Sequence, residues 1–571
     1  MQFTIEVNNK SIKAEKGETI LSALNRNGIM IPTLCRMQEF SPTGACRMCV
    51  VEVDGRDRLV TACSAPVEEW MKIQTHSPRV IRARKTIVEL LLSNHPDDCL
   101  YCDRNLDCEL QKLSDQLQVR ERRIRGSKIK PRRDQSSPAI VRELSKCILC
   151  GRCIRVCEEV ITATSIDFIG RGRMTHVGPA MDRDFNFSSC IHCGQCVLVC
   201  PTGALHEKHY ISEVQEYLSK NDVTRVIQYS PFVPYALAEE MGVKYVRDFD
   251  RVLNAVLRKI GFEKVYLSGT GTDILVRELT ETLIISKSAP KKQPLIVSAC
   301  PAWVKYCEQF QPDILPMLSA LKTPQQITGA IIKSAVKTPE DKSRIYTVSV
   351  TPCTAMKFEA RRDSMTRKGI SDVDTVLTVR ELARLIALYG IDISNIDPEP
   401  ADDPMSLRSS AALLAETSGG ITEAVLRSLI TRAEEKEADK QVFKKLRLSG
   451  TFREVTATIG GEEYSVAVID GLKGFGKFKQ MLSEGVAYDL VEVMACPGGC
   501  VNGGGMIPAG SKDAVRLRSK FIYISDEQEA VRGPMESAAI ATLYDRVFKE
   551  NPELSEKNLF NTHFAKRDLL L

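Results

Sequence analysis

Two stretches of the chain carry the same cysteine pattern: Cys147-Ile-Leu-Cys-Gly-Arg-Cys-Ile-Arg-Val-Cys157 and Cys190-Ile-His-Cys-Gly-Gln-Cys-Val-Leu-Val-Cys200, the second followed by Pro201. Each reads C-x2-C-x2-C-x3-C, so residues 138 to 209 contain an internal repeat. Four closely spaced thiolates are a common ligand set of an iron–sulfur cluster. The repeat therefore predicts a small domain that binds two clusters.

The two quartets have the spacing of bacterial ferredoxins with two [4Fe–4S] clusters. In that arrangement the fourth cysteine of each motif binds the other cluster. The spacing predicts a first cluster held by Cys147, Cys150, Cys153 and Cys200. It predicts a second cluster held by Cys157, Cys190, Cys193 and Cys196. We therefore expect residues 138–209 to form a two-cluster ferredoxin domain.

Residues 1–80 contain a different quartet, C-x10-C-x2-C-x13-C, formed by Cys35, Cys46, Cys49 and Cys63. Short strands are predicted at 3–7, 49–53 and 58–63, and Asp54-Gly55 is typical of a hairpin turn. The plant-type [2Fe–2S] pattern has a shorter first gap, so we interpret this one as a variant on a β-grasp fold. A structural zinc site is the alternative.

The third ligand set lies in residues 81–126 and has the spacing H-x3-C-x2-C-x5-C. Its members are His95, Cys99, Cys102 and Cys108. One histidine and three cysteines can hold zinc or a [4Fe–4S] cluster, and the position between two cluster motifs favours iron–sulfur. We expect residues 81–117 to be helical. The other histidines receive no role; they are His76, His176, His192, His206, His209 and His563.

Length, charge and cysteine content limit the classes of protein to which the chain can belong. The chain has 571 residues, too many for one core, and a formal net charge of +5, which does not indicate nucleic-acid binding. The basic stretch from Arg120 to Arg133 could bind an acidic partner, but a solvated linker is the favoured interpretation. No membrane helix or secretion signal is recognisable. We expect a cytoplasmic protein whose 20 cysteines bind metal instead of forming disulfides.

From residue 210 to 571 the pattern changes to alternating buried strands and helices, which indicates an α/β domain. Strands are predicted at 223–229, 295–298, 345–350 and 488–494, and helices at 236–241, 301–310 and 379–388. Residues 397–406 are rich in Pro and Asp and are expected to form a surface loop. The fold class predicted for the whole chain is thus multidomain α+β and α/β.

Five cysteines are spread through this last region, and four of them lie in three recognisable segments. These are Val297-Ser-Ala-Cys-Pro-Ala-Trp303, Thr351-Pro-Cys-Thr-Ala-Met-Lys-Phe-Glu359 and Met494-Ala-Cys-Pro-Gly-Gly-Cys-Val-Asn-Gly-Gly-Gly505. Together they resemble the three signatures of [FeFe]-hydrogenases. The resemblance implies an H-cluster, a [4Fe–4S] cube joined to a diiron unit that carries CO, cyanide and an azadithiolate.

By resemblance the cube is bound by Cys300, Cys353, Cys496 and Cys500, and Cys500 bridges to the diiron unit. Maturases would supply that unit. Cys307 is left over and is interpreted as a buried small residue. Met494 matches the methionine that lies over the diiron unit in the family. Glu359 matches the glutamate of the family's second signature.

The resemblance also implies a proton relay of Glu278, Glu281 and Ser319. Most family members have a further relay cysteine where this chain has Ala299, and alanine has no proton to give. Ordinary helix glutamates are the alternative interpretation of Glu278 and Glu281, which lie three apart on one helix face. A water could replace the missing thiol.

Two more positions depart from the family pattern. Met356 replaces a lysine that donates to a cyanide, and methionine cannot donate a hydrogen bond. The neighbouring Lys357 is expected to point elsewhere. Phe232, after Pro231, stands where a small residue is expected near the cofactor. Gly499, and Gly503 in the glycine run after Cys500, are expected to let the backbone pack against the cofactor. The run does not lie in the strand–GxGxxG–helix context of a nucleotide-binding loop, so we reject that interpretation.

The sequence thus predicts an [FeFe]-hydrogenase that passes electrons through accessory clusters to a small ferredoxin, working as a monomer. A hydrogen sensor is the second hypothesis, because Ala299 is compatible with it; we expect no room for a signalling domain before Leu571. An electron-transfer iron–sulfur subunit would explain the first 209 residues but not the three signatures. A maturation or scaffold protein would usually lack the [2Fe–2S] domain.

Overall fold

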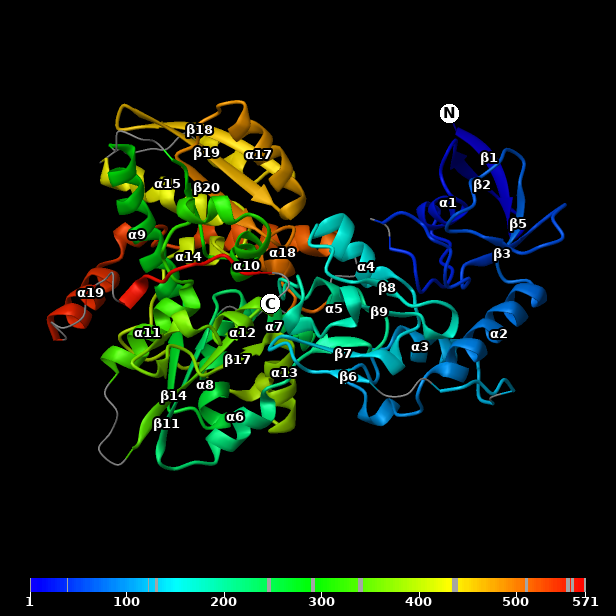
Figure 1. Cartoon of the computed structure of the whole chain (residues 1–571), viewed down its shortest axis with the longest axis horizontal. Helices are drawn as coiled ribbons and strands as arrows, with labels where there is room; N and C mark the ends of the chain where they lie inside the picture. The colour runs from blue at the N-terminus through cyan, green and yellow to red at the C-terminus, as the bar shows by residue number, and fades with distance from the viewer. Residues whose placement is uncertain are drawn as a thin grey trace.

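The computed structural model describes residues 2–37, 40–121, 123–128, 132–243, 248–288, 293–336, 342–433, 440–508, 512–550, 555 and 559–568. Figure 1 shows the two N-terminal regions at one end of the molecule and the region after residue 210 at the other, with the cysteine repeat between them. The cysteine repeat therefore lies between the N-terminal ligand sets and the large region. No helix in the described ranges is long and apolar enough to cross a membrane.

The N-terminal region is a five-stranded sheet that covers one helix. Its strand order is β2 (Lys10–Glu15), β1 (Gln2–Val7), β5 (Lys72–Gln74), β3 (Val50–Val53) and β4 (Val60–Thr61). Helix α1 (Ile20–Arg26), which the sequence reading missed, starts at Thr19, whose side chain accepts from the Ser22 N–H. Ile20 and Leu24 of this helix are fully buried in the core under the sheet.

The next region corrects one prediction, because residues 81–117 are not continuously helical. Helix α2 (Pro78–Asn94) ends before His95, which has an extended backbone, and α3 (Glu109–Gln116) begins only after Cys108. The only helical element in between is the short 3₁₀ turn η1 (Cys99–Tyr101). A loop is needed there, because ligands spaced over fourteen residues of straight helix could not converge on one site.

The cysteine repeat is also a repeat of backbone conformation. Helices α4 (Arg152–Arg155) and α5 (Gln195–Val199) each follow a glycine in the left-handed region, Gly151 at φ 72° and Gly194 at φ 71°. Leu149 and His192, each two residues after the first cysteine of its motif, have φ of 54° and 57°. The domain is closed by the sheet β10 (Leu205–Glu207), β7 (Ile140–Glu143) and β6 (Arg133–Asp134) and carries the hairpin β8 (Asp167–Ile169) and β9 (His176–Gly178).

The region after residue 210 contains two four-stranded sheets. The first is parallel, with the order β12 (Lys264–Leu267), β11 (Val223–Tyr229), β14 (Arg344–Thr351) and β17 (Thr375–Thr378). The second has the order β13 (Leu295–Ile296), β20 (Leu490–Met494), β19 (Glu462–Asp470) and β18 (Phe452–Ile459), and only β18 is antiparallel to its neighbour. The small hairpin β15 (Thr366–Arg367) and β16 (Ile370–Ser371) stands apart.

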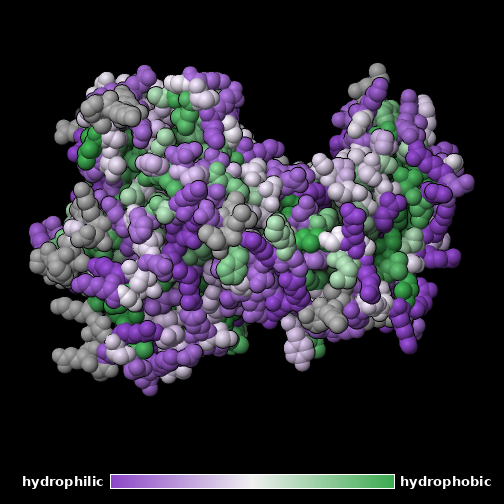
Figure 2. Space-filling model, in the orientation of Figure 1, coloured by the Kyte–Doolittle hydropathy of each residue, from purple (hydrophilic) through white to green (hydrophobic). Residues whose placement is uncertain are grey.

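Helices cover both sheets, as Figure 1 shows. Their bounds are α6 (Ile211–Leu218), α7 (Val233–Glu240), α8 (Phe249–Ile260), α9 (Gly269–Lys287), α10 (Pro301–Phe310), α11 (Pro324–Ala335), α12 (Ala355–Glu359), α13 (Val379–Leu388), α14 (Ser410–Leu414), α15 (Gly420–Arg432), α16 (Lys440–Leu446), α17 (Phe475–Ser483), α18 (Lys512–Gln528) and α19 (Ala538–Glu550). The α/β character predicted for this region is confirmed. The exterior seen in Figure 2 is mostly hydrophilic, as expected of a water-exposed surface.

Candidate iron–sulfur and active site

The two cysteine quartets of the repeat line two separate cavities. The first has about 480 Å³ of empty space, including space open to solvent, and among its lining residues are Cys147, Cys150, Cys153 and Cys200. The second has about 340 Å³ of such space, and among its lining residues are Cys157, Cys190, Cys193 and Cys196. The structure therefore groups the eight cysteines with the fourth ligand exchanged between motifs, as the spacing predicts. Apolar cavities with four thiols each suit [4Fe–4S] clusters.

The N-terminal quartet also converges. The thiol of Cys35 lies within hydrogen-bonding reach of Cys46 and Cys63. Cys49 is close to Cys63, whose backbone N–H donates to Cys49 Sγ over 3.4 Å. These four cysteines come from two loops and a strand end of the sheet domain, and the donor set fits a [2Fe–2S] cluster.

The third ligand set lies beside the first cavity of the ferredoxin domain. His95 and Cys108 are buried, whereas Cys99 is exposed. A side chain at Gly203 would meet Cys102 Sγ at 2.5 Å, and Arg104 donates to the Cys200 carbonyl over 2.8 Å. The loop therefore abuts the segment that follows the last ferredoxin cysteine.

The sheet domain contacts the ferredoxin domain through a different residue. Arg155, between Cys153 and Cys157, donates to the carbonyls of Cys35 and Ser41. Both N-terminal ligand sets thus border the ferredoxin domain, each through an arginine contact of its own.

The last four ligands lie where parallel strands end. Cys300 follows β13, Cys353 follows β14, and Cys496 follows β20, with Cys500 four residues later. Ligand sites in parallel sheets form at the carboxyl ends of strands. Here the strand ends come from two different sheets, so the fold brings together four cysteines that are up to 200 residues apart.

Burial is the main electrostatic feature of this site. It raises the pKa of the Cys353 thiol to about 12. It raises the pKa of Cys496 and Cys500 well above the ordinary value, and the neighbouring thiols add to the effect. A buried thiolate is therefore stable only with a cation beside it. The donor set fits a cluster, whose irons would supply that charge.

A side chain of the ferredoxin domain reaches directly into this site. Gln195 donates from Nε2 to Cys496 Sγ over 3.4 Å and to the Asn502 carbonyl over 2.6 Å. The backbones also meet, because a side chain at Gly504 would lie 2.6 Å from the Gly194 Cα. The glycine run was expected to face the cofactor; at Gly504 it instead admits the loop of Cys193.

His192, to which the sequence reading gave no role, lies at the same boundary. It is fully buried, its Nδ1 is 3.1 Å from Ser137 Oγ, and its Nε2 is 3.0 Å from Lys305 Nζ. Its carbonyl accepts from Thr354, the residue after Cys353. Burial and the Lys305 charge lower the pKa of His192 well below its usual value, so the neutral ring accepts from Lys305.

The three residues that depart from the family pattern are buried, and two of them, Ala299 and Met356, are close to these cysteines in sequence. Ala299 is 9% exposed and Met356 is 8% exposed, so both side chains are shielded from bulk water. Lys357 points away, with Nζ 2.5 Å from Glu381 and from the Lys208 carbonyl. Phe232 is 2% exposed and packs in the apolar cluster that contains Leu413.

The retained residues have defined partners. Thr323 donates to Glu359 over 2.7 Å, and burial raises the pKa of Glu359 to about 7. Met494 ends β20 and is buried. Pro231 lies against Gly269, with a distance of 3.1 Å from its Cγ to the position of a Cβ there.

The predicted relay residues each have a partner of their own. Ser319 donates its N–H to the Ile296 carbonyl over 2.7 Å. Glu278 accepts from Tyr544 over 2.6 Å, and Glu281 forms an ion pair with Arg432 at the surface. The relay itself remains a prediction.

Glu416 is a further site residue that the sequence reading missed. It accepts a hydrogen bond from the Ser230 hydroxyl and lies within hydrogen-bonding reach of Cys500. Burial raises its pKa to about 7. A side chain at Gly499 would meet its carbonyl oxygen at 2.7 Å, so the glycine permits this contact. No local motif marks Glu416, which is 84 residues before Cys500.

Four family matches cover the chain in the order of these sites. The 2Fe-2S iron-sulfur cluster binding domain matches residues 1–78, and the NADH-ubiquinone oxidoreductase-G iron-sulfur binding region matches residues 84–123. The 4Fe-4S dicluster domain matches residues 146–204. The iron only hydrogenase large subunit, C-terminal domain, matches residues 223–504. The geometry and these matches define a multi-cluster iron–sulfur oxidoreductase.

Relatives of full length narrow this class. The chain is 36% identical to the NADP-reducing hydrogenase subunit HndD of Solidesulfovibrio fructosivorans, over 100% of both chains. It is 32% identical to iron hydrogenase 1 of Clostridium pasteurianum, over 99% of this chain and 100% of the relative. A solved [FeFe]-hydrogenase HydA1 from Chlamydomonas reinhardtii matches with a TM-score of 0.52 and 26% identity, over 63% of this chain and 99% of that one. The chain belongs to the iron-only, or [FeFe], hydrogenase family.

Proposed function

We propose that this hydrogenase interconverts molecular hydrogen with protons and electrons, and that its accessory clusters carry the electrons to and from a small ferredoxin. The observation that carries the proposal is the position of Cys300, Cys353, Cys496 and Cys500. They meet at the carboxyl ends of strands from two sheets. One of them, Cys496, is hydrogen-bonded to the ferredoxin domain through Gln195.

The ligand sets support a specific inventory of cofactors. It comprises one [2Fe–2S] cluster, three accessory [4Fe–4S] clusters and an H-cluster with CO, cyanide and azadithiolate. His95, Cys99, Cys102 and Cys108 would hold the accessory [4Fe–4S] cluster outside the ferredoxin repeat. When bound, the H-cluster supplies the metal and the amine base for hydrogen chemistry, and the protein supplies position and electrostatics.

The chain's own residues define an electron route of short contacts. Arg104 and Arg155 join the two N-terminal sites to the ferredoxin domain. Gln195 and the Gly194–Gly504 contact join that domain to the active site. The contacts keep successive ligand sets in fixed positions.

The proton route through the protein differs from that of most family members at one residue, Ala299. Ala299 cannot carry a proton, so a proton must pass this position on a water or through another group. Glu281 and Arg432 mark the surface end of the expected route. Glu416 is a further carboxyl group beside the site, within hydrogen-bonding reach of Cys500. Met356 contributes no hydrogen bond from its side chain, whereas Glu359 keeps its partner Thr323.

Exposed apolar side chains beside Cys99 support a docking place for the electron partner. Leu100, Tyr101 and Leu106 are 85%, 90% and 81% exposed. Apolar exposure of this size around a ligand loop is typical of a transient contact surface. Maturases are the other partners that the proposal requires. A monomer would suffice for this function, because one chain contains every ligand set.

The test measures hydrogen oxidation and evolution by the anaerobically matured protein, together with infrared spectra in the CO and cyanide region. Turnover with CO and cyanide bands supports the proposal, and Cys500→Ser is expected to abolish both. Bands with negligible turnover would favour the hydrogen-sensor hypothesis, which Ala299 also fits. Intact clusters without bands after maturation would identify an electron carrier instead.

A further inference from the structure

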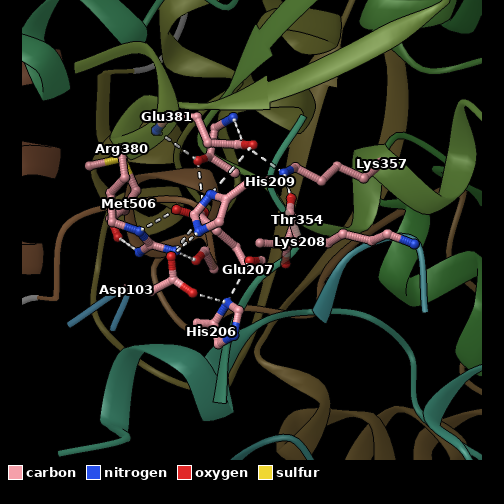
Figure 3. Close-up of polar contacts among 12 residues, drawn as sticks. Asp103, His206, Glu207, Lys208, His209, Thr354, Lys357, Arg380, Glu381 and Met506 are labelled. Atoms are coloured by element: carbon pink, nitrogen blue, oxygen red, sulfur yellow. Dashed lines mark hydrogen bonds and ion pairs between the residues drawn. The ribbon is translucent and has the colours of Figure 1, made fainter. Parts of the chain in front are cut away.

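Asp103, His206 and His209 form a cluster of ligand-type side chains outside every site described above. Asp103 lies in the loop between Cys102 and Cys108, His206 lies on β10, and His209 lies just before α6. One ligand atom from each of the three residues falls within 4.8 Å of the other two. Figure 3 shows the Asp103 carboxylate between the two imidazole rings.

Each carboxylate oxygen of Asp103 contacts a different imidazole ring. Oδ2 is 2.8 Å from His206 Nδ1, and Oδ1 is 2.8 Å from His209 Nε2. Two ligands bound to one zinc ion at about 2.0 Å lie roughly 3.3 Å apart in a tetrahedron. Each carboxylate oxygen and its partner nitrogen therefore need to separate only slightly to share an ion.

The second nitrogen of each ring faces another carboxylate. His206 Nε2 is 3.1 Å from Glu143, and His209 Nδ1 is 3.9 Å from Glu381. Histidines that bind metal usually donate their second N–H to a carboxylate, which fixes the ring and raises its basicity. His206 has such a hydrogen-bond partner in Glu143, whereas the Glu381 carboxylate lies near His209 beyond hydrogen-bond distance.

We propose that Asp103, His206 and His209 bind a divalent transition-metal ion of the zinc type. Two imidazoles and one carboxylate form a donor set for such ions. Glu143 orients the His206 ring from behind, and the Glu381 carboxylate adds negative charge beside His209. A fourth position faces the exposed side chain of Arg384, whose Nη1 is 3.2 Å from His209 Nε2. The guanidinium moves outward when the ion binds, and water takes the fourth position.

The ion would fasten three parts of the chain to one another. Asp103 belongs to the ligand loop of the third cluster, whereas His206 and His209 belong to the end of the ferredoxin domain. Glu381, behind His209, is on α13 of the catalytic region and is held by Lys357. The site does not include any cluster ligand, so it is independent of the proposed hydrogen chemistry.

The test uses the full chain with its clusters assembled, incubated with ZnCl₂ under anaerobic conditions and then desalted. Zinc and iron are counted by mass spectrometry, and zinc K-edge absorption identifies the bound atoms. We expect about one tightly bound zinc per chain with N/O neighbours near about 2.0 Å, and no sulfur near about 2.3 Å. Asp103→Asn and His209→Ala are expected to lower zinc occupancy at least about tenfold without loss of iron.

His176→Ala is the matched control, because His176 also contacts an aspartate, Asp182, at 2.9 Å, and is 23% exposed against 25% for His209. It should retain the zinc. Wild-type protein that binds no zinc, zinc that persists in both site variants, or a zinc–sulfur signal would each overturn the proposal. A rise in the unfolding temperature with zinc in wild type, absent in His209→Ala, would support it independently.

Discussion

Gln195 donates a hydrogen bond to the sulfur of Cys496 across the boundary between the ferredoxin domain and the catalytic region. The two residues are 301 positions apart in sequence, yet the sulfur lies 3.4 Å from the amide nitrogen. A hydrogen bond to a ligand sulfur stabilises the added negative charge of a reduced cluster. This single contact therefore connects domain packing to the reduction potential of the active site.

Gln195→Leu should lower the reduction potential of the H-cluster cube, because it removes that donor with little change in volume. Infrared spectra recorded at controlled potentials measure the shift. Gln309→Leu is the control, since Gln309 donates to the Ser188 carbonyl over 3.3 Å and not to a cysteine ligand. An unchanged potential in Gln195→Leu, with all clusters present, would show that the contact has no electronic effect.

Ala299→Cys should increase turnover if the missing thiol limits proton transfer. Proton relays contribute roughly 10²–10⁴-fold to rates, so we expect a gain of at least about tenfold. Rates of hydrogen evolution, normalised to the infrared bands of the cofactor, give the answer. In Ala299→Ser the new side chain is nearly as large as cysteine, but its hydroxyl is much less acidic than a thiol. The turnover of this variant should therefore increase far less. Equal turnover in all three proteins would place the limiting step elsewhere.

Arg380 should be important for stability at the same boundary. It pairs with Glu207 of the ferredoxin domain at 2.8 Å and donates to the Gly504 carbonyl, also at 2.8 Å. Removing one partner from a buried ion pair costs about 3–5 kcal/mol. Arg380→Met should therefore lower the unfolding midpoint clearly. Arg516→Met, whose ion pair with Asp513 is exposed, should change it by less than about 1 kcal/mol.

Asp273 should make stability depend on pH. It is fully buried, accepts two hydrogen bonds from Ser409, and burial raises its pKa from 3.8 to about 6. Because the folded pKa lies above the unfolded one, the stabilisation is complete below the unfolded value and is lost as pH rises through about 6. The full loss is about 3 kcal/mol, of which about 1–1.5 falls between pH ~5 and pH ~8.

Denaturant unfolding at about pH 5 and about pH 8 measures this term. Asp273→Asn cannot ionise, and the Ser409 hydroxyl can rotate to accept from its amide. The difference between wild type and variant should therefore change by about 1–1.5 kcal/mol between the two pH values. A constant difference would contradict the assignment to Asp273.

The cluster ligands could be predicted from the sequence because their information is local. Spacing of two or three residues between cysteines fixes a loop that wraps an iron atom, whatever the rest of the fold does. The exchange of Cys157 and Cys200 between cavities follows from the same rule. The α/β class was equally accessible, because buried parallel strands such as Val223–Tyr229 are continuous apolar runs.

The remaining features depend on distant segments. Glu416 and Ser230 are 186 residues apart, and Asp103 and His206 are 103 positions apart in the chain. No pattern in a single sequence states that such pairs meet. The break in the helix at His95 was missed for a related reason, since the apolar periodicity of 81–117 competes with the need of the ligands for a loop.

The contact between Gly194 and Gly504 has one more consequence. Domains within one chain usually meet through side chains and can slide or tilt. Here two main chains touch, and a methyl group at either position would meet atoms 2.3–2.9 Å away. The gap between the last ferredoxin cysteines and the active-site cysteines is therefore set by peptide geometry. Substitutions at the protein surface can change which molecule delivers electrons. The distance between the ferredoxin domain and the active-site cysteines, which the electrons cross last, stays fixed.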